Sequence, residues 1–168
     1  PTLVGNWNQM TEPRTMRAEH LWDEDCYWND QQNGEASATF SVNVTESGRY
    51  RVYLWWDGQP FNASAVPVTI HHKDGTETII VDQKSQGFAF WEQPIGTYEF
   101  EAGDGATVTL TNEVSGPGFN RVFADAVKFI CDEEDESGEV STGPDPCDPP
   151  TDPTGAVELL KEEGAEVV

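Results

Sequence analysis

The alternation of apolar and polar residues along most of the chain predicts a series of short β-strands. In residues 36–44 every second residue is apolar or small, which is the period-2 pattern of a strand with one buried face. The pattern returns in residues 49–56, where Tyr50, Val52, Leu54 and Trp56 share one face. Further strands are expected at residues 66–72, 76–81, 95–100, 106–111 and 121–130.

Turn residues separate these predicted strands. Lys73-Asp74-Gly75 is typical of a hairpin, because Asp-Gly suits a turn with positive φ, and Gly103-Asp104-Gly105 is a second turn signal. The strands recur at intervals of roughly ten residues, and no long helical pattern interrupts them. The sequence therefore predicts an all-β fold, an antiparallel β-sandwich of the jelly-roll type.

Composition divides the chain near Cys131. Residues 1–131 hold all 18 aromatic residues and a net charge of −10, whereas residues 132–168 hold no aromatic residue and a net charge of −12. We expect a β-sandwich domain at residues 1–131 and an acidic, proline-rich linker at 132–153. The C-terminal segment at 154–168 has a short helical pattern and ends in apolar, strand-forming residues.

The overall charge excludes several classes of partner. The chain has 31 acidic and 9 basic residues, for a formal net charge of −22. Such a polyanion lacks the basic surface that nucleic acid requires, and anionic lipid headgroups repel it. No apolar run approaches the roughly 20 residues of a membrane span. We therefore expect neither nucleic-acid binding nor membrane insertion.

The three cysteines do not form a metal-binding motif but permit a disulfide. Cys131 and Cys147 flank the acidic run, and a bond between them would close a loop of about 15 intervening residues. A bond from Cys26 to either of them is an alternative pairing, and three separate thiols are the remaining interpretation.

Catalytic chemistry has little support in the sequence. Histidine occurs only at positions 20, 71 and 72, and two successive residues of a strand point to opposite faces. We expect no catalytic residues and no enzymatic activity.

Two kinds of binding are candidates. Sugar rings stack on exposed aromatic side chains, and the candidates for a glycan site are Trp22, Trp28, Trp55 and Trp91. Calcium prefers several oxygen ligands, and the candidates for a calcium site are Asp23, Glu24, Asp25 and Asp30. For the tryptophans, the alternative interpretation is that they pack in the core. For the acidic residues, it is that they are solvated charges without a ligand.

Several segments, in order, resemble the golvesin C-terminal-like domain, which is also met as the carbohydrate-binding-like module of xanthan lyases. The matching segments are Val4–Trp7, Ser47–Trp56, Asn62–Gly75, Val81–Gln83, Ile95–Phe100 and Phe123–Phe129. The resemblance implies an extracellular or cell-surface jelly-roll module that is attached to a larger protein and binds without chemistry of its own.

This sequence departs from the family pattern in three places. It carries an acidic, tryptophan-rich insertion around residues 21–32, it adds the acidic tail, and it lacks the opening apolar strand that precedes the Gly-x-Trp motif in the family. The last residues, 164–168, are similar to that missing strand.

A sandwich that lacks one strand exposes unpaired backbone groups, and a strand from elsewhere can complete it. We expect Ala165, Glu166, Val167 and Val168 to act as the donor strand, and an acceptor edge near Leu3, Val4 and Trp7. Donation to a neighbouring copy would give a head-to-tail homo-oligomer or filament. Folding back onto the same chain, or a following repeat that begins at this strand, are the other two interpretations. A module that binds polysaccharide is the alternative function.

Overall fold

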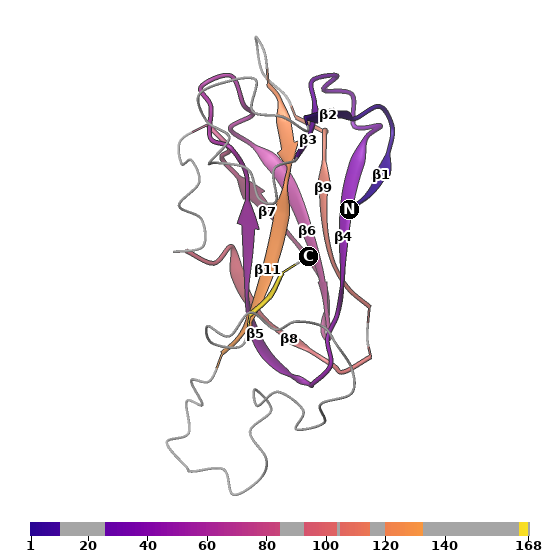
Figure 1. Cartoon of the computed structure of the whole chain (residues 1–168), viewed down its shortest axis with the longest axis vertical. Helices are drawn as coiled ribbons and strands as arrows, with labels where there is room; N and C mark the ends of the chain where they lie inside the picture. Colours follow the sequence, from indigo (N-terminus) through magenta and orange to yellow (C-terminus); the bar gives the residue numbers. More distant parts are fainter. Residues whose placement is uncertain (11–25, 85–92, 104, 115–119, 133–164, 168) are drawn as a thin grey trace, which may run out of the picture.

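The computed structural model describes residues 1–10, 26–84, 93–103, 105–114, 120–132 and 165–167. All the regular elements in this part of the chain are β-strands (Figure 1). They are β1 (Thr2–Val4), β2 (Asn8–Met10), β3 (Cys26–Asn29), β4 (Ser37–Asn43), β5 (Gly48–Trp55), β6 (Val66–His72), β7 (Gly75–Val81), β8 (Gly96–Phe100), β9 (Gly105–Thr111), β10 (Val122–Ala124), β11 (Ala126–Cys131) and β12 (Ala165–Val167).

The strands form three antiparallel sheets. The largest has the order β1-β4-β9-β6-β7, the second has the order β12-β11-β5-β8, and a small one has the order β10-β3-β2. In Figure 1 the sheet that contains β5 and β11 lies in front of the sheet that contains β4, β6 and β9. The all-β sandwich predicted from the sequence is confirmed.

The core lies between the two larger sheets and follows the predicted alternation. Phe40 and Val42 of β4 are at most 2% exposed, and Val52 and Leu54 of β5 are fully buried. One continuous cluster of buried side chains joins these residues to Phe129 of β11. Burial of this apolar surface is the main source of stability for a fold of this kind.

Two expectations about the strands are corrected. Residues 121–130 form two strands, β10 and β11, which part at Asp125. The reason is that the two halves have different partners: β10 pairs with β3, and β11 pairs with β5 and β12. The predicted insertion at residues 21–32 also contains β3, the central strand of the small sheet, so this part of it belongs to the fold.

The C-terminal residues form the predicted strand. Lys128, Phe129 and Ile130 of β11 pair with Val167, Glu166 and Ala165 of β12, respectively. β12 thus occupies the edge of the second sheet, on the side of β11 that faces away from β5. In the part of the chain that the structure describes, no helix has the length and apolar character of a membrane span.

Candidate functional site

An arginine that contacts two aromatic rings is the most distinctive arrangement on the described surface. The guanidinium carbon of Arg121 lies 4.3 Å from the ring centroid of Trp28 and 5.0 Å from that of Phe61. Arg121 and Trp28 are partly buried, whereas Phe61 is 39% exposed. We call Trp28, Phe61 and Arg121 the aromatic clamp. Its cation–π contacts fix three side chains that come from three separate segments.

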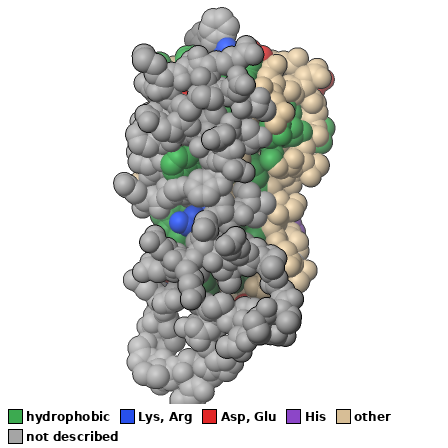
Figure 2. Space-filling view, viewed as in Figure 1, with side chains coloured by type: hydrophobic (Ala, Val, Ile, Leu, Met, Phe, Trp, Pro, Cys, Tyr) green, Lys and Arg blue, Asp and Glu red, His purple; other side chains and the backbone are tan. Residues whose placement is uncertain are grey.

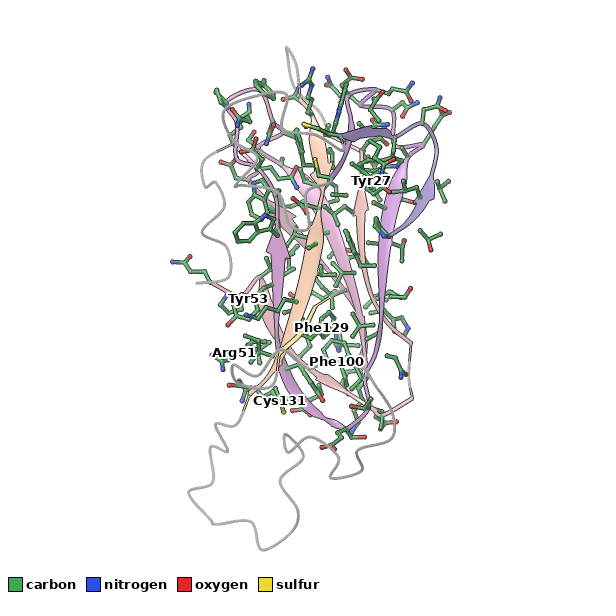
Figure 3. All side chains as sticks on the ribbon, viewed as in Figure 1. Tyr27, Arg51, Tyr53, Phe100, Phe129 and Cys131 are labelled. Atoms are coloured by element: carbon green, nitrogen blue, oxygen red, sulfur yellow. The ribbon has the colours of Figure 1, made fainter. Side chains whose placement is uncertain are left out.

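The backbone holds the aromatic clamp in place from two sides. The Arg121 amide donates to the Phe61 carbonyl over 3.2 Å, and the Ala63 amide donates to the Arg121 carbonyl over 2.8 Å. The segment that begins immediately after Arg121 is β10, which pairs with β3, the strand that carries Trp28. Trp28 lies next to Tyr27, and Figure 3 places Tyr27 at one end of the sandwich and Cys131 towards the other.

A buried network of amide groups lies beneath the loop that carries Phe61. Asn62 is completely buried, and its Nδ2 donates to the carbonyls of Asp57 and Gln83 over 2.7 and 3.1 Å. The indole of Trp56 also donates to the Gln83 carbonyl, over 3.1 Å. Gln59 donates to the Asp57 carboxylate over 2.7 Å, which closes the turn. The Asn62 amide group thus supplies two hydrogen bonds that hold this loop in place.

A second group of amides ties the neighbouring loops together. Asn112 is fully buried, and its Nδ2 donates to Asn29 and Asn33, each over 2.8 Å. Its Oδ1 accepts from the Ala36 amide over 2.9 Å, and Asn29 donates to the Asn6 carbonyl over 2.7 Å. All polar atoms of the Asn112 side chain are therefore used within the fold.

The tryptophans predicted to bind glycan have different outcomes. Trp28 is partly exposed and belongs to the aromatic clamp, whereas Trp22 and Trp91 lie outside the described residues. Trp55 is only 9% exposed and Trp56 only 2%, so both faces at the end of β5 are covered. Trp55 is therefore a core residue and not an exposed sugar platform, which corrects the prediction.

Sequence reasoning missed two members of the aromatic clamp. Phe61 lies outside the predicted strands, Arg121 is the first residue of the strand expected at 121–130, and neither belongs to a tryptophan-rich segment. The sequence held one indication of Phe61: it is an apolar residue outside the predicted strands, directly before the family motif that begins at Asn62. Nothing in the sequence indicated that Arg121 would stack on it.

The donor strand and its expected acceptor lie in different sheets. Leu3 and Val4 belong to β1, which pairs with β4 in the five-stranded sheet, and the Trp7 indole donates to the Val4 carbonyl over 2.9 Å. β12 pairs instead with β11 of the same chain. Within the chain, β12 therefore lies along Lys128–Ile130, whereas the expected acceptor region around Leu3–Trp7 belongs to another sheet and stays a prediction. Val168 lies outside the described residues.

The expected calcium site and disulfide stay predictions. Asp30 is exposed, and the other three candidate ligands, residues 23–25, lie outside the described residues. Cys147 also lies outside them, while Cys26 carries a buried thiol. Cys26 precedes Tyr27, which Figure 3 shows far from Cys131. Because disulfide-bonded cysteines have Cα atoms within about 7 Å of each other, a Cys26–Cys131 bond is excluded.

Strands β5 and β11 carry three cationic side chains, Arg49, Arg51 and Lys128, whose contacts differ from those of Arg121. Arg49 and Arg51 form ion pairs with Asp132, whose oxygens lie 3.5 Å from Arg49 Nε and 3.4 Å from Arg51 Nε. The Lys128 ammonium lies 5.8 Å from the Tyr53 ring centroid. Burial, and secondarily the nearby Arg51, lower the pKa of Lys128 from its ordinary value. Figure 2 shows Lys and Arg side chains at only a few points of the described surface on the face it presents.

Comparison with known proteins gives one family and two informative structures. The sequence model of the Golvesin C-terminal domain family matches residues 2–131. A xanthan lyase from Bacillus sp. (strain GL1) is 38% identical over 130 residues, which are 77% of this chain and 13% of that protein. The chain thus spans only a small part of the curated relative that it matches.

The structural comparison agrees with the sequence comparison. The structure of Paenibacillus xanthan lyase superposes with a TM-score of 0.65 at 30% identity, over 77% of this chain and 12% of that one. An exo-β-1,3-galactanase from Phanerochaete chrysosporium superposes with a TM-score of 0.50 at 12% identity, over 76% of this chain and 27% of that one. The second match concerns the fold alone.

Proposed function

Because the chain belongs to the Golvesin C-terminal domain family, we propose that it is a non-catalytic module of a secreted or cell-surface protein and that it binds polysaccharide. The observation that carries the proposal is the aromatic clamp, in which an exposed ring is held rigidly beside a guanidinium. The relatives that the chain matches are named as xanthan lyases, and xanthan is therefore the first polysaccharide to test.

The aromatic clamp has the properties of a sugar platform. The faces of pyranose rings carry C–H groups that pack against aromatic rings, and Phe61 offers such a ring at 39% exposure. Its loop is fixed by the Arg121–Phe61 backbone hydrogen bond and by the buried Asn62. A ring that is already ordered loses little conformational entropy on binding, which favours affinity.

The polar groups around the aromatic clamp support binding rather than catalysis. The side chains beneath the loop are largely amides, such as Asn62 and Gln83, and amides do not exchange protons in acid–base catalysis. Among the described residues no three His, Cys, Asp or Glu side chains are grouped as metal ligands would be. The chemistry that this arrangement offers is recognition.

Titration of xanthan fragments into the protein tests the proposal. We expect saturable binding with a change in tryptophan fluorescence, because Trp28 is part of the site. Phe61→Ala should weaken binding by about tenfold, which corresponds to about 1.4 kcal/mol for a stacked ring. Ile80→Ala is the matched control, because Ile80 is an exposed apolar residue, at 63%, on strand β7 and is not a member of the aromatic clamp. Equal affinity of the two variants would rule out the aromatic clamp as the binding site.

A second function, head-to-tail self-assembly, is favoured by the pairing of β12 with β11. The edge that β12 occupies within its own chain is open to the same segment of a neighbouring copy, as in domain swapping. The donor is Ala165–Val168 and the acceptor is Lys128–Ile130. Both strands are short, so the interface depends on backbone hydrogen bonds along one edge.

Light scattering and negative-stain electron microscopy of the non-reduced protein test assembly. We expect the full chain to form concentration-dependent oligomers and a chain that ends at Gly164 to stay monomeric. Circular dichroism of the truncated chain serves as the control for a folded sandwich. A truncated chain that still assembles, or a full chain that is monomeric at high concentration, would contradict strand exchange between copies.

A further inference from the structure

The charge of Arg121 is unusual in its surroundings. The chain has 31 acidic and 9 basic residues, so a cation on its surface is expected to have a carboxylate beside it. Arg49 and Arg51 share Asp132, and Lys73 lies 3.4 Å from Glu101. Within the described residues, Arg121 contacts two aromatic rings and has no carboxylate at ion-pair distance.

The guanidinium of Arg121 is also only partly satisfied. Its Nε is buried and has no hydrogen-bond acceptor. The terminal nitrogens are not buried in this way, and the residue as a whole is partly exposed. A guanidinium presents its donors in a planar fork that matches the two oxygens of a carboxylate. The clamping rings fix that plane before a ligand arrives.

We propose that the aromatic clamp selects sugars that carry a carboxylate, with the Arg121 guanidinium binding the carboxylate and the Phe61 ring packing against the sugar face. This inference rests on the proposed polysaccharide-binding function and adds the chemical class of the ligand, an acidic glycan. The positive charge of Arg121 is complementary to the carboxylate, and the rings reduce its contact with water, which strengthens the charge-assisted hydrogen bonds.

The net charge of −22 sets the conditions for a test. At low ionic strength the acidic surface repels any acidic glycan over a long distance, whereas at about 0.15 M salt the Debye length is about 8 Å. Measurements at this salt concentration report the local contact rather than the net charge.

Two matched pairs of polysaccharides separate charge from shape. The probes are xanthan and polygalacturonate, each compared with its carboxyl-reduced form, in which every carboxylate is replaced by a primary alcohol. We expect at least one acidic form to bind about tenfold more tightly than its reduced partner. Arg121→Gln should remove this preference, so that the variant binds the acidic and the reduced form with equal affinity. Arg121→Lys should keep only part of the preference, because an ammonium lacks the planar fork.

Each outcome has a defined meaning. If acidic and reduced forms bind the protein equally well and Phe61→Ala weakens both, the selectivity for carboxylates is wrong and the polysaccharide-binding function stands. If none of the four probes binds, both are wrong. If Arg121→Gln keeps the preference while its melting temperature matches that of the native chain, another cation makes the contact and the assignment to Arg121 is wrong.

Discussion

Gln83 pairs with both backbone polar groups of Phe123. Its Oε1 accepts from the Phe123 amide and its Nε2 donates to the Phe123 carbonyl, each over 2.9 Å. Gln83 is completely buried, and its side-chain amide acts here as a short substitute for a neighbouring strand beside β10. The contact holds β10, the strand that follows Arg121, in place, and it thereby stabilises the position of Arg121 in the aromatic clamp.

Gln83→Leu should therefore be strongly destabilising. The substitution leaves the amide and carbonyl of Phe123 buried without partners, and each such group costs about 1–3 kcal/mol, for an expected loss of about 2–5 kcal/mol. Urea denaturation followed by fluorescence measures the free energy of unfolding. Gln31→Leu is the control, because Gln31 is exposed and should change stability by less than about 0.5 kcal/mol. Similar losses in both variants would mean that the contact to Phe123 contributes little.

The Gly-x-Trp motif has a steric cause that can be tested by a pair of variants. Gly5 has φ +80°, and a Cβ at this position would lie 2.8 Å from the Cβ of Ala36. Gly103 has nearly the same φ, +82°, and nothing within 4 Å of such a Cβ. Gly103→Ala should cost about 1 kcal/mol from backbone strain alone, whereas Gly5→Ala should cost about 2–4 kcal/mol because overpacking is added.

Thermal unfolding of the two variants under the same conditions checks this difference. If the two alanine variants lose equal stability, the close approach to Ala36 is relieved by small backbone shifts, and the motif needs only the positive φ. The Trp7 indole, which donates to the Val4 carbonyl over 2.9 Å, would then be the remaining constraint on this turn.

The strands of the core were predictable because burial on one face imposes a period of two. Val66, Val68 and Ile70 alternate in the sequence and are all 0% exposed in the structure. β3 was missed for the opposite reason: Cys26 and Asn29 are buried at its ends, while Tyr27 and Trp28 between them are partly exposed, so the strand shows no alternation. Four residues with this pattern are indistinguishable from a loop in the sequence.

The candidate site was less predictable than the fold, because its contacts join segments that are distant in the sequence. Trp28 was selected as an exposed aromatic residue, but its partner Arg121 lies 93 positions further along the chain and stacks on it only after β10 pairs with β3. Trp55 was misassigned because alternation shows which residues share a face but not whether another segment covers that face.

Tyr98 makes stability depend on pH in the alkaline range. Burial, and secondarily the charge of Glu77, raise the pKa of Tyr98 above its ordinary value of 10.0. The folded state therefore holds the phenolic proton more tightly than the unfolded state. The contribution of Tyr98 to the free energy of unfolding is therefore fully present below about pH 10, and it is lost as the pH rises through the pKa of the folded state.

A comparison of the native chain with Tyr98→Phe isolates this effect. The free energy of unfolding of the native chain should decrease more steeply above about pH 10 than that of the variant, because only the native chain has the phenol to ionise. The absorbance of tyrosinate during the titration should show one late-titrating group that is absent from the variant. Parallel pH profiles would mean that Tyr98 ionises equally in the folded and unfolded states.

We predict a single disulfide, Cys131–Cys147. Cys26 is 1% exposed, and its thiol is not part of a disulfide in the structure. The backbone amide of Asp132, next to Cys131, donates to the Arg49 carbonyl over 2.7 Å, which fixes the end of β11. A thiol reagent should detect no reactive group in the folded, oxidised protein, one after denaturation and three after reduction as well. Peptide mapping should identify the linked cysteines, and reduction should cost about 3 kcal/mol of stability.

The place of β12 within its own chain can be tested by hydrogen exchange in the monomer. Along Lys128–Ile130, successive backbone amides of β11 point alternately to β5 and to β12. In a chain that ends at Gly164, the amides that point to β12 should exchange much faster, whereas those that point to β5 should keep their protection, because the β5 pairing is unchanged. Loss of protection on both sides would show that β12 stabilises the whole sheet. If neither side changes, β12 does not occupy this edge in solution, and strand exchange between copies would lose its acceptor.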